Sequence, residues 1–126
     1  MKTEKIYTQH AENTEWANAL AFYKDDIKVM ENRLEEIASK NSSKDVLAKV
    51  EQFQNRLLID KNTIDILKHK INISNDEIHN DVNKNTTAVD HRAIKDHTDL
   101  RNDMKIFDLN FISLRSELNL FLLKWM

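Results

Sequence analysis

Four of the five histidines, together with one aspartate, are the candidate metal ligands of this chain: His10, His79, His91, His97 and Asp96. Helical bundles hold iron, manganese or zinc through inward-facing carboxylates and imidazoles, usually in repeated Glu-x-x-His pairs that place both ligands on one helix face. Here only Asp76 and His79 have that spacing, and a row of carboxylates, Asp96, Asp99 and Asp103, follows helical steps beside His97. Because the repeated pair is missing, we interpret these groups as solvated surface residues and His97 as a hydrogen-bonded residue at the core edge, with a metal-binding carboxylate and histidine bundle as the alternative.

Catalytic chemistry of other kinds has little support. The chain contains no Gly, Pro or Cys, and an oxyanion hole or a phosphate cradle depends on turns that glycine makes possible. Asp60 occupies an otherwise apolar position, where an acid is more often a device that sets helix register, paired with a basic residue or turned toward water. The sequence therefore predicts a protein that is not an enzyme and needs no cofactor.

A long amphipathic helix must carry His10. Apolar residues recur in alternating steps of four and three, at Trp16, Leu20, Tyr23, Ile27, Met30, Leu34 and Ile37. Such a heptad pattern predicts a helix over residues 9–40 with coiled-coil-like packing. The poor helix formers that follow, and the capping-box spacing of Ser42 and Asp45, predict a turn and the start of a second helix at residue 43.

The second heptad pattern should carry His79. It comprises Val46, Val50, Phe53, Leu57, Asp60, Ile64, Leu67 and Ile71, and it continues in frame at Ile78 and Val82. Ser74 and Glu77 have capping-box spacing, which would divide this segment into two helices. Because the apolar frame runs past them without a shift, we expect one continuous helix over residues 43–84.

The third helix should position His91 and His97 and run over residues 87–125, beginning at the capping pair Thr87 and Asp90. Its apolar stripe comprises Val89, Ala93, His97, Leu100, Met104, Phe107, Phe111, Leu114, Leu118, Phe121 and Trp125. A repeat of 3.5 residues and a repeat of 3.6 residues select different members of the pair Asp96 and His97 for the inward position. Short connections make successive helices antiparallel, so residues 1–126 are predicted to form one all-α domain, an elongated antiparallel three-helix bundle.

The C-terminal part of the third helix is apolar on more than one face, and two neighbouring helices cannot cover such a segment fully. We therefore expect a homo-oligomer, with the symmetric dimer, the commonest form, as the expected state. Capture of a helix from another protein is the alternative. The expected interface residues are Leu109, Ile112, Leu120, Leu122, Leu123 and Trp125. These features predict a non-enzymatic structural or protein-interaction bundle.

Composition narrows the remaining classes. The formal net charge is −2, and acidic and basic residues alternate along the chain, which argues against nucleic-acid binding. No stretch approaches the roughly 18 apolar residues of a membrane-spanning helix, and the first residues lack the apolar core of an export signal. We expect a cytoplasmic protein.

Four segments resemble a group of small, uncharacterised bacterial helical-bundle proteins: Leu34-Glu-Glu-Ile-Ala-Ser-Lys-Asn, Thr87-Ala-Val-Asp-His-Arg92, Asp96-His-Thr-Asp-Leu-Arg101 and Phe121-Leu-Leu-Lys-Trp-Met126. The resemblance implies a helical fold and a bacterial source, and it implies no activity and no functional residue. The arrangement of long helices with a Trp in the first is also similar to spectrin-like repeats, a generic similarity that identifies no partner.

Overall fold

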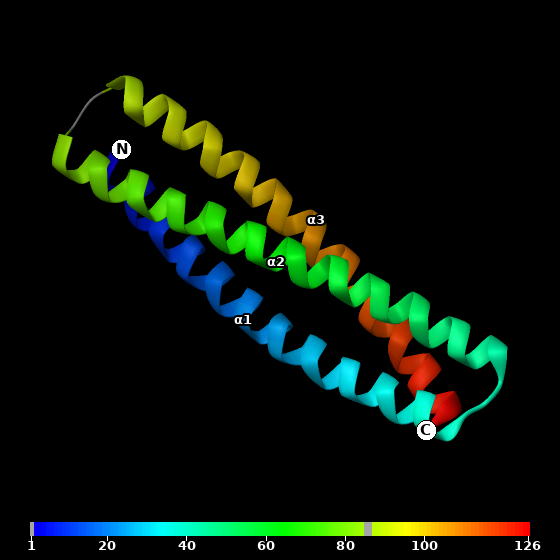
Figure 1. Ribbon diagram of the computed structural model, residues 1–126. Helices are drawn as coiled ribbons and strands as arrows, with labels where there is room; N and C mark the ends of the chain where they lie inside the picture. Colours follow the sequence, from blue (N-terminus) through cyan, green and yellow to red (C-terminus); the bar gives the residue numbers. More distant parts are fainter. Residues whose placement is uncertain (1, 85–86) are drawn as a thin grey trace.

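Three long helices make up the described chain in a computed structural model. The backbone is described for residues 2–84 and 87–126, and the side chains for residues 7–79 and 97–126. Helix α1 comprises Lys2–Lys40, α2 comprises Lys44–Lys84 and α3 comprises Thr87–Trp125, with no strand in these ranges. The helices lie side by side in an elongated rod, with the N-terminus at the end where α2 leads toward α3 (Figure 1). The predicted all-helical fold with three helices is confirmed.

The helix boundaries differ from the predicted ones at two starts. Helix α1 begins at Lys2 instead of residue 9, because the intervening residues include no Gly or Pro that would disfavour a helix. Helix α2 begins at Lys44, so the residue before it is Ser43, and the predicted cap at Ser42 is wrong by one position. The main-chain amide of Leu47 donates to the carbonyl of Ser43 at 3.0 Å and closes the first turn.

Helix α2 runs through Ser74 without a break over its 41 residues, as the continuous apolar frame indicates. Ser74 is buried, and its hydroxyl oxygen accepts a hydrogen bond from Asn13 on α1 at 3.0 Å. The residue that resembles a helix cap therefore faces the core. Its small side chain and tertiary partner remove the need for a helix end at this point.

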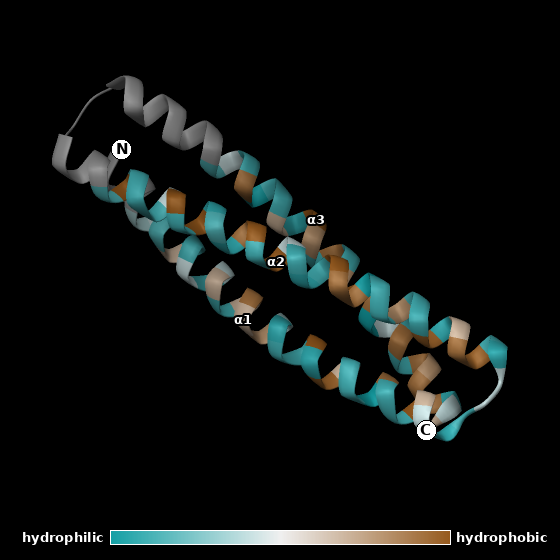
Figure 2. Ribbon diagram, viewed as in Figure 1, coloured by the Kyte–Doolittle hydropathy of each residue, from teal (hydrophilic) through white to brown (hydrophobic). Residues whose placement is uncertain are grey.

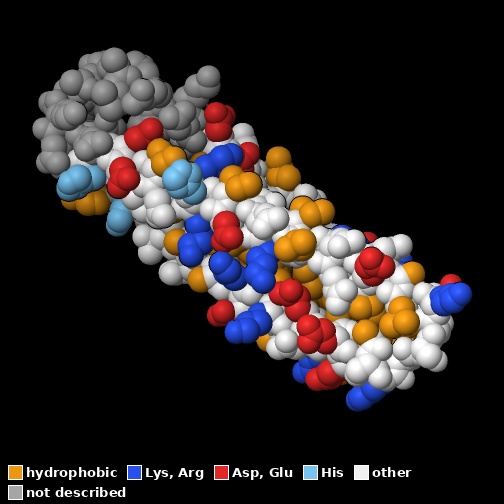
Figure 3. Space-filling view, viewed as in Figure 1, with side chains coloured by type: hydrophobic (Ala, Val, Ile, Leu, Met, Phe, Trp, Pro, Cys, Tyr) orange, Lys and Arg blue, Asp and Glu red, His pale blue; other side chains and the backbone are white. Residues whose placement is uncertain are grey.

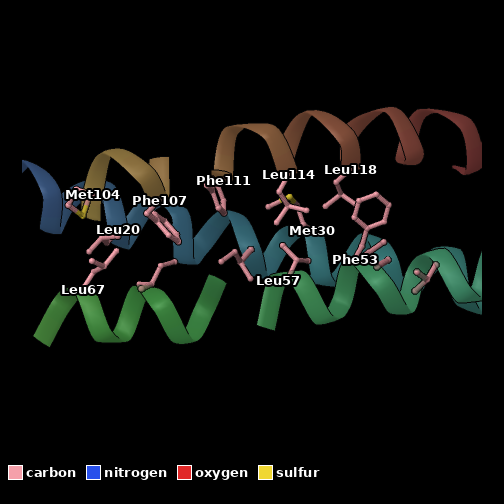
Figure 4. Packing of buried hydrophobic residues seen from close by; sticks show 14 of the residues in the cluster. Leu20, Met30, Phe53, Leu57, Leu67, Met104, Phe107, Phe111, Leu114 and Leu118 are labelled. Atoms are coloured by element: carbon pink, nitrogen blue, oxygen red, sulfur yellow. The ribbon is translucent and has the colours of Figure 1, made fainter. Parts of the chain in front are cut away.

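The hydrophobic core runs along the inner faces of all three helices (Figure 4). The described cluster consists of residues from the three heptad patterns: Leu20, Ile27, Met30, Leu34, Ile37, Val46, Val50, Phe53, Leu57, Ile64, Leu67, Ile71, Leu100, Met104, Phe107, Phe111, Leu114 and Leu118. Trp125, the last residue of the third pattern, is exposed, and the side chains of Val82, Val89 and Ala93 lie outside the described residues. Hydrophilic residues make up much of each described helix, while hydrophobic residues are frequent in the last turns of α3 (Figure 2). Within the described residues, no helix combines the length and the apolar character needed to cross a bilayer.

Ion pairs between the outer edges of the helices show their register. The pairs are Lys24–Asp65 at 3.1 Å, Lys61–Glu31 at 3.6 Å, Lys70–Asp103 at 2.9 Å, Arg56–Glu117 and Arg115–Asp26. From Lys24 to Glu31 on α1, the paired residue on α2 changes from Asp65 to Lys61, so residue numbers fall on α2 as they rise on α1. Exposed pairs of this kind add little stability, so burial of the apolar stripes is the main force that holds the helices together.

Candidate functional site

A layer of polar side chains interrupts the core toward the end of the rod where the sequence places its histidines. Asn13 on α1, Ser74 on α2 and His97 on α3 are 0%, 8% and 2% exposed. Each occupies a position of its helix's heptad frame, because Asn13 lies three residues before Trp16, Ser74 three after Ile71 and His97 three before Leu100. The layer is thus built by one inward polar residue from each helix.

The amide of Asn13 joins α1 to α2. Its Nδ2 donates to the Ser74 hydroxyl oxygen at 3.0 Å and to Oδ1 of Asn75 at 3.0 Å. Both protons of the amide are therefore used. Its Oδ1 is buried and has no hydrogen-bond partner among the described residues.

A second group of contacts joins α1 to α3 through the carboxylate of Glu12. Arg101 donates from Nε to Oε2 at 2.9 Å and from a terminal nitrogen to Oε1 at 2.6 Å, while Nε2 of His97 lies 3.1 Å from Oε1. The two arginine bonds form the bidentate fork that guanidinium makes with carboxylates. The ring of Trp16 stacks on the imidazole, with 5.1 Å between the ring centroids. Glu12 and Trp16 together hold the imidazole in one orientation.

These contacts determine the protonation of Glu12. The hydrogen bond from Arg101 lowers the pKa of the Glu12 carboxyl below its ordinary value of 4.5, against the opposing effect of burial, and the hydrogen bond from His97 acts in the same direction. An ionised carboxylate only accepts hydrogen bonds, so Nε2 of His97 carries a proton. Nδ1 of His97 is buried and has no hydrogen-bond partner among the described residues.

The polar layer has the features of an alignment device. Hydrogen bonds between specific residues on different helices are satisfied only in one register, and a single polar residue at a heptad position is known to select register at some loss of stability. Among the described side chains, His97 contacts a carboxylate and an indole. These contacts fix the position of α1 relative to α3.

The predicted metal ligands are not all brought together. His10 and His79 are exposed, whereas His97 is buried against Glu12. His97 therefore occupies the inward position on α3. The side chains of His91 and Asp96 lie outside the described residues. Of the nearby carboxylates, Asp76 and Asp99 are exposed and Asp103 pairs with Lys70. Among described side chains, no group of three or more His, Asp or Glu residues is arranged to hold a metal ion.

The sequence analysis did not single out Asn13 of the polar layer, nor Glu12 and Arg101, which form the ion pair beside it. Asn13 could have been found by extending the first heptad pattern backward by three residues from Trp16. The contact between Glu12 and Arg101 has no sequence signal, because the two residues are 89 positions apart and meet only when α1 packs on α3.

Asp60 lies in the second heptad pattern and is half-buried. Burial raises the pKa of its carboxyl above the ordinary value of 3.8, and the nearby positive charge of Arg56 opposes the increase. Because Arg56 also pairs with Glu117, Asp60 shares that charge with a second carboxylate. This environment is consistent with the interpretation of Asp60 as a residue that affects register and stability.

The outer face of α3 presents the second candidate site. Leu109, Ile112, Leu120 and Leu123 are 62%, 53%, 70% and 81% exposed. Of the other predicted interface residues, Trp125 is also exposed, while Leu122 is partly buried and packs against the core. Leu122 therefore contributes to the bundle itself, and the free apolar surface is formed mainly by the four residues named first.

Charge does not gather over either candidate site. On the face shown in Figure 3, Lys and Arg side chains alternate with Asp and Glu side chains, and hydrophobic side chains reach the surface between them. Two charged residues of α3 beside its outer face form ion pairs with the neighbouring helices. Arg115 pairs with Asp26 on α1, and Glu117 pairs with Arg56 on α2. On the face shown in Figure 3, charges of the two signs are therefore mixed.

Comparisons with protein-family models, with curated proteins and with solved structures find no match for this chain. The resemblance to small bacterial helical-bundle proteins therefore stays a prediction.

Proposed function

We propose that this protein is a non-enzymatic structural or protein-interaction module, an antiparallel three-helix bundle with coiled-coil-like packing that self-associates through the C-terminal half of α3. The observation that carries the proposal is the exposure of Leu109, Ile112, Leu120 and Leu123 on one helix. Contiguous apolar surface on a folded domain is typical of interaction sites. The ion pairs across the helix edges support the antiparallel order of α1 and α2.

The polar layer supports the same proposal from the other end of the rod. Asn13 and Glu12 tie α1 to α2 and to α3 in one register, and a fixed register presents the outer face of α3 in one fixed shape. An interaction module benefits from such rigidity, because less conformational entropy is lost on binding. An enzyme would instead need reactive groups in a cleft.

Static light scattering of the full chain from about 1 to 200 μM tests self-association, since dimers with interfaces of modest size dissociate in the micromolar range. We expect the mean mass to rise from that of the monomer toward that of a dimer across this range. A mass that stays at the 14.9 kDa of one chain at every concentration would contradict the proposal.

Metal binding, the alternative class, has a separate test that includes the residues outside the described ranges. Elemental analysis of protein purified without chelator should find no stoichiometric iron, manganese or zinc if the module is a pure scaffold. A stoichiometric metal that is lost in His97→Ala would favour the alternative, because His97 is the candidate ligand that the fold buries.

A further inference from the structure

The apolar residues on the outer face of α3 are symmetrically spaced around Ser116. Leu109 and Leu123 lie seven residues before and after it, and Ile112 and Leu120 lie four residues before and after it. Offsets of four and seven keep all five residues on one side of a helix with 3.6 residues per turn. All five are exposed. We call these residues, with Ser113, the outer α3 face.

We propose that the outer α3 face binds the same face of a second copy of this chain, with the two α3 helices antiparallel and the twofold axis passing beside Ser116. Leu109 of one copy then contacts Leu123 of the other, Ile112 contacts Leu120, and the two Ser116 residues meet. This arrangement rests on the self-association proposed above and specifies its geometry. A twofold interface requires that a surface be complementary to itself, and symmetric spacing around one residue provides that complementarity.

The distribution of charge favours the antiparallel orientation over the parallel one. Lys105 continues the outer α3 face, four residues before Leu109, and is exposed. Two parallel copies in register would bring Lys105 against itself, and like charges in contact are destabilising. In the antiparallel arrangement the two Lys105 side chains lie at opposite ends of the interface, because each is eleven residues before the Ser116 of its own helix. The outer α3 face itself then contributes only uncharged side chains to the contact.

The charged residues beside the outer α3 face do not oppose this arrangement. Arg115 and Glu117, on either side of Ser116, would lie near their own copies across the twofold axis. Arg115 is already paired with Asp26, and Glu117 with Arg56, within the same chain. Each like-charge approach is therefore neutralised by an intramolecular partner.

The available area fits a weak dimer. The exposed parts of the four apolar residues and of neighbouring Ile106, which is 59% exposed, amount to roughly 600 Å² per copy, at the lower end of about 600 to 1,000 Å² per partner in specific complexes. Ser113 and Ser116 are small, so the helix axes can approach to about 8 Å, the short end of the usual range. We therefore expect dissociation in the micromolar range.

A pair of matched substitutions tests the location. Leu120→Glu places two carboxylates in the twofold interface and should weaken dimerisation at least tenfold in sedimentation velocity. Ile59→Glu on α2 introduces the same charge at a position that is 63% exposed and should leave dimerisation unchanged. If Ile59→Glu dissociates the dimer and Leu120→Glu does not, self-association stands and the assigned face is wrong.

Engineered cysteines test the orientation, since the chain contains no Cys of its own. Leu109→Cys and Leu123→Cys are mixed under reducing conditions and oxidised, with each variant oxidised alone for comparison. In the antiparallel dimer a disulfide forms only in the mixture, because identical positions are about 21 Å apart along the helix, while a disulfide needs Cα atoms about 4.4 to 6.8 Å apart. Ser116→Cys should cross-link alone.

The outcomes separate this inference from the general proposal. Cross-linking of Leu109→Cys and of Leu123→Cys each with itself would establish a parallel dimer and overturn the inference while self-association stands. A dimer in which neither the mixture nor Ser116→Cys cross-links would overturn the register. A wild-type chain that is monomeric at all concentrations would overturn both proposals.

Discussion

Replacing the polar contacts of Asn13 by apolar ones should stabilise the bundle. The double substitution Asn13→Leu with Ser74→Ala removes the amide and the hydroxyl that pair across α1 and α2 at 3.0 Å. Leu branches at the same carbon as Asn and is close to it in shape, so the completely buried position of Asn13 can accept it with little rearrangement. The heptad pattern of α1 then continues one position further.

The magnitude follows from the contacts that are lost and gained. Asn13 makes two neutral hydrogen bonds, each of which contributes about 1 kcal/mol. Its buried, unpartnered Oδ1 has a desolvation penalty of about 1 to 3 kcal/mol that the substitution removes. Burial of a leucine side chain contributes about 1.5 to 3 kcal/mol. The gains exceed the losses, and we expect the free energy of unfolding to rise by about 2 kcal/mol.

Urea denaturation followed by circular dichroism, at one fixed chain concentration, measures this difference. The midpoint should move to higher urea while the slope of the transition stays constant, which identifies a change of stability alone. The single variant Asn13→Ala is the control, because it removes the same hydrogen bonds and leaves a cavity, and it should destabilise. A double variant that is less stable than the wild type by 1 kcal/mol or more would refute the reasoning, since the polar contacts would then contribute net stability.

Three further substitutions test the core and the titrating groups, each by urea denaturation. Leu114→Ala in the buried cluster should lower the free energy of unfolding by about 2 to 5 kcal/mol, whereas exposed Leu58→Ala should change it by no more than about 0.5 kcal/mol; equal effects would contradict the assigned core. The wild-type chain should be more stable than Glu12→Gln above pH 4.5, because Arg101 lowers the pKa of Glu12. This difference in stability should disappear as the pH falls through the pKa of Glu12 in the folded state. A difference that persists at pH 2 would exclude the ion pair as its source. Asp60→Asn should increase the free energy of unfolding at pH 7, because burial raises the pKa of Asp60 above 3.8. This gain in stability should vanish at pH values below 3.8, where the wild-type carboxyl is protonated in both the folded and the unfolded chain. A gain that grows on acidification would contradict this assignment.

Residue periodicity was sufficient to predict the helices and most of the core. Leu20, Ile27 and Leu34 belong to a pattern of alternating four- and three-residue steps. Such a pattern indicates which face of a helix is buried, and it does so independently of the partner that covers the face. The same frame decided correctly that α2 continues through Ser74. The capping-box spacing of Ser74 and Glu77 is a local signal for a helix start. In the folded chain the Ser74 hydroxyl instead accepts a hydrogen bond from Asn13 on another helix.

The polar layer could be predicted only in part. Folding the chain at its two connections gives the approximate position of His97 along the rod. Whether Asp96 or His97 faces inward depends on the small difference between a repeat of 3.5 and one of 3.6 residues per turn. The partners of His97 come from another helix, and nothing near Glu12 in the sequence indicates that it meets Arg101. Side-chain pairing across helices follows from packing, which local patterns do not contain.

Among the described residues, the polar layer lies between Ile78 and the main hydrophobic cluster. Ile78 is buried, yet it lies outside the continuous hydrophobic cluster, which on α2 ends at Ile71, on the other side of Ser74. An opening of α2 that begins beyond Ser74 therefore exposes Ile78 and the hydrogen bonds of Asn13 before it reaches the main cluster. Amide hydrogens of residues 75–79 should exchange with solvent through partial opening, whereas those around Leu57 and Ile64 should exchange only when the whole bundle unfolds.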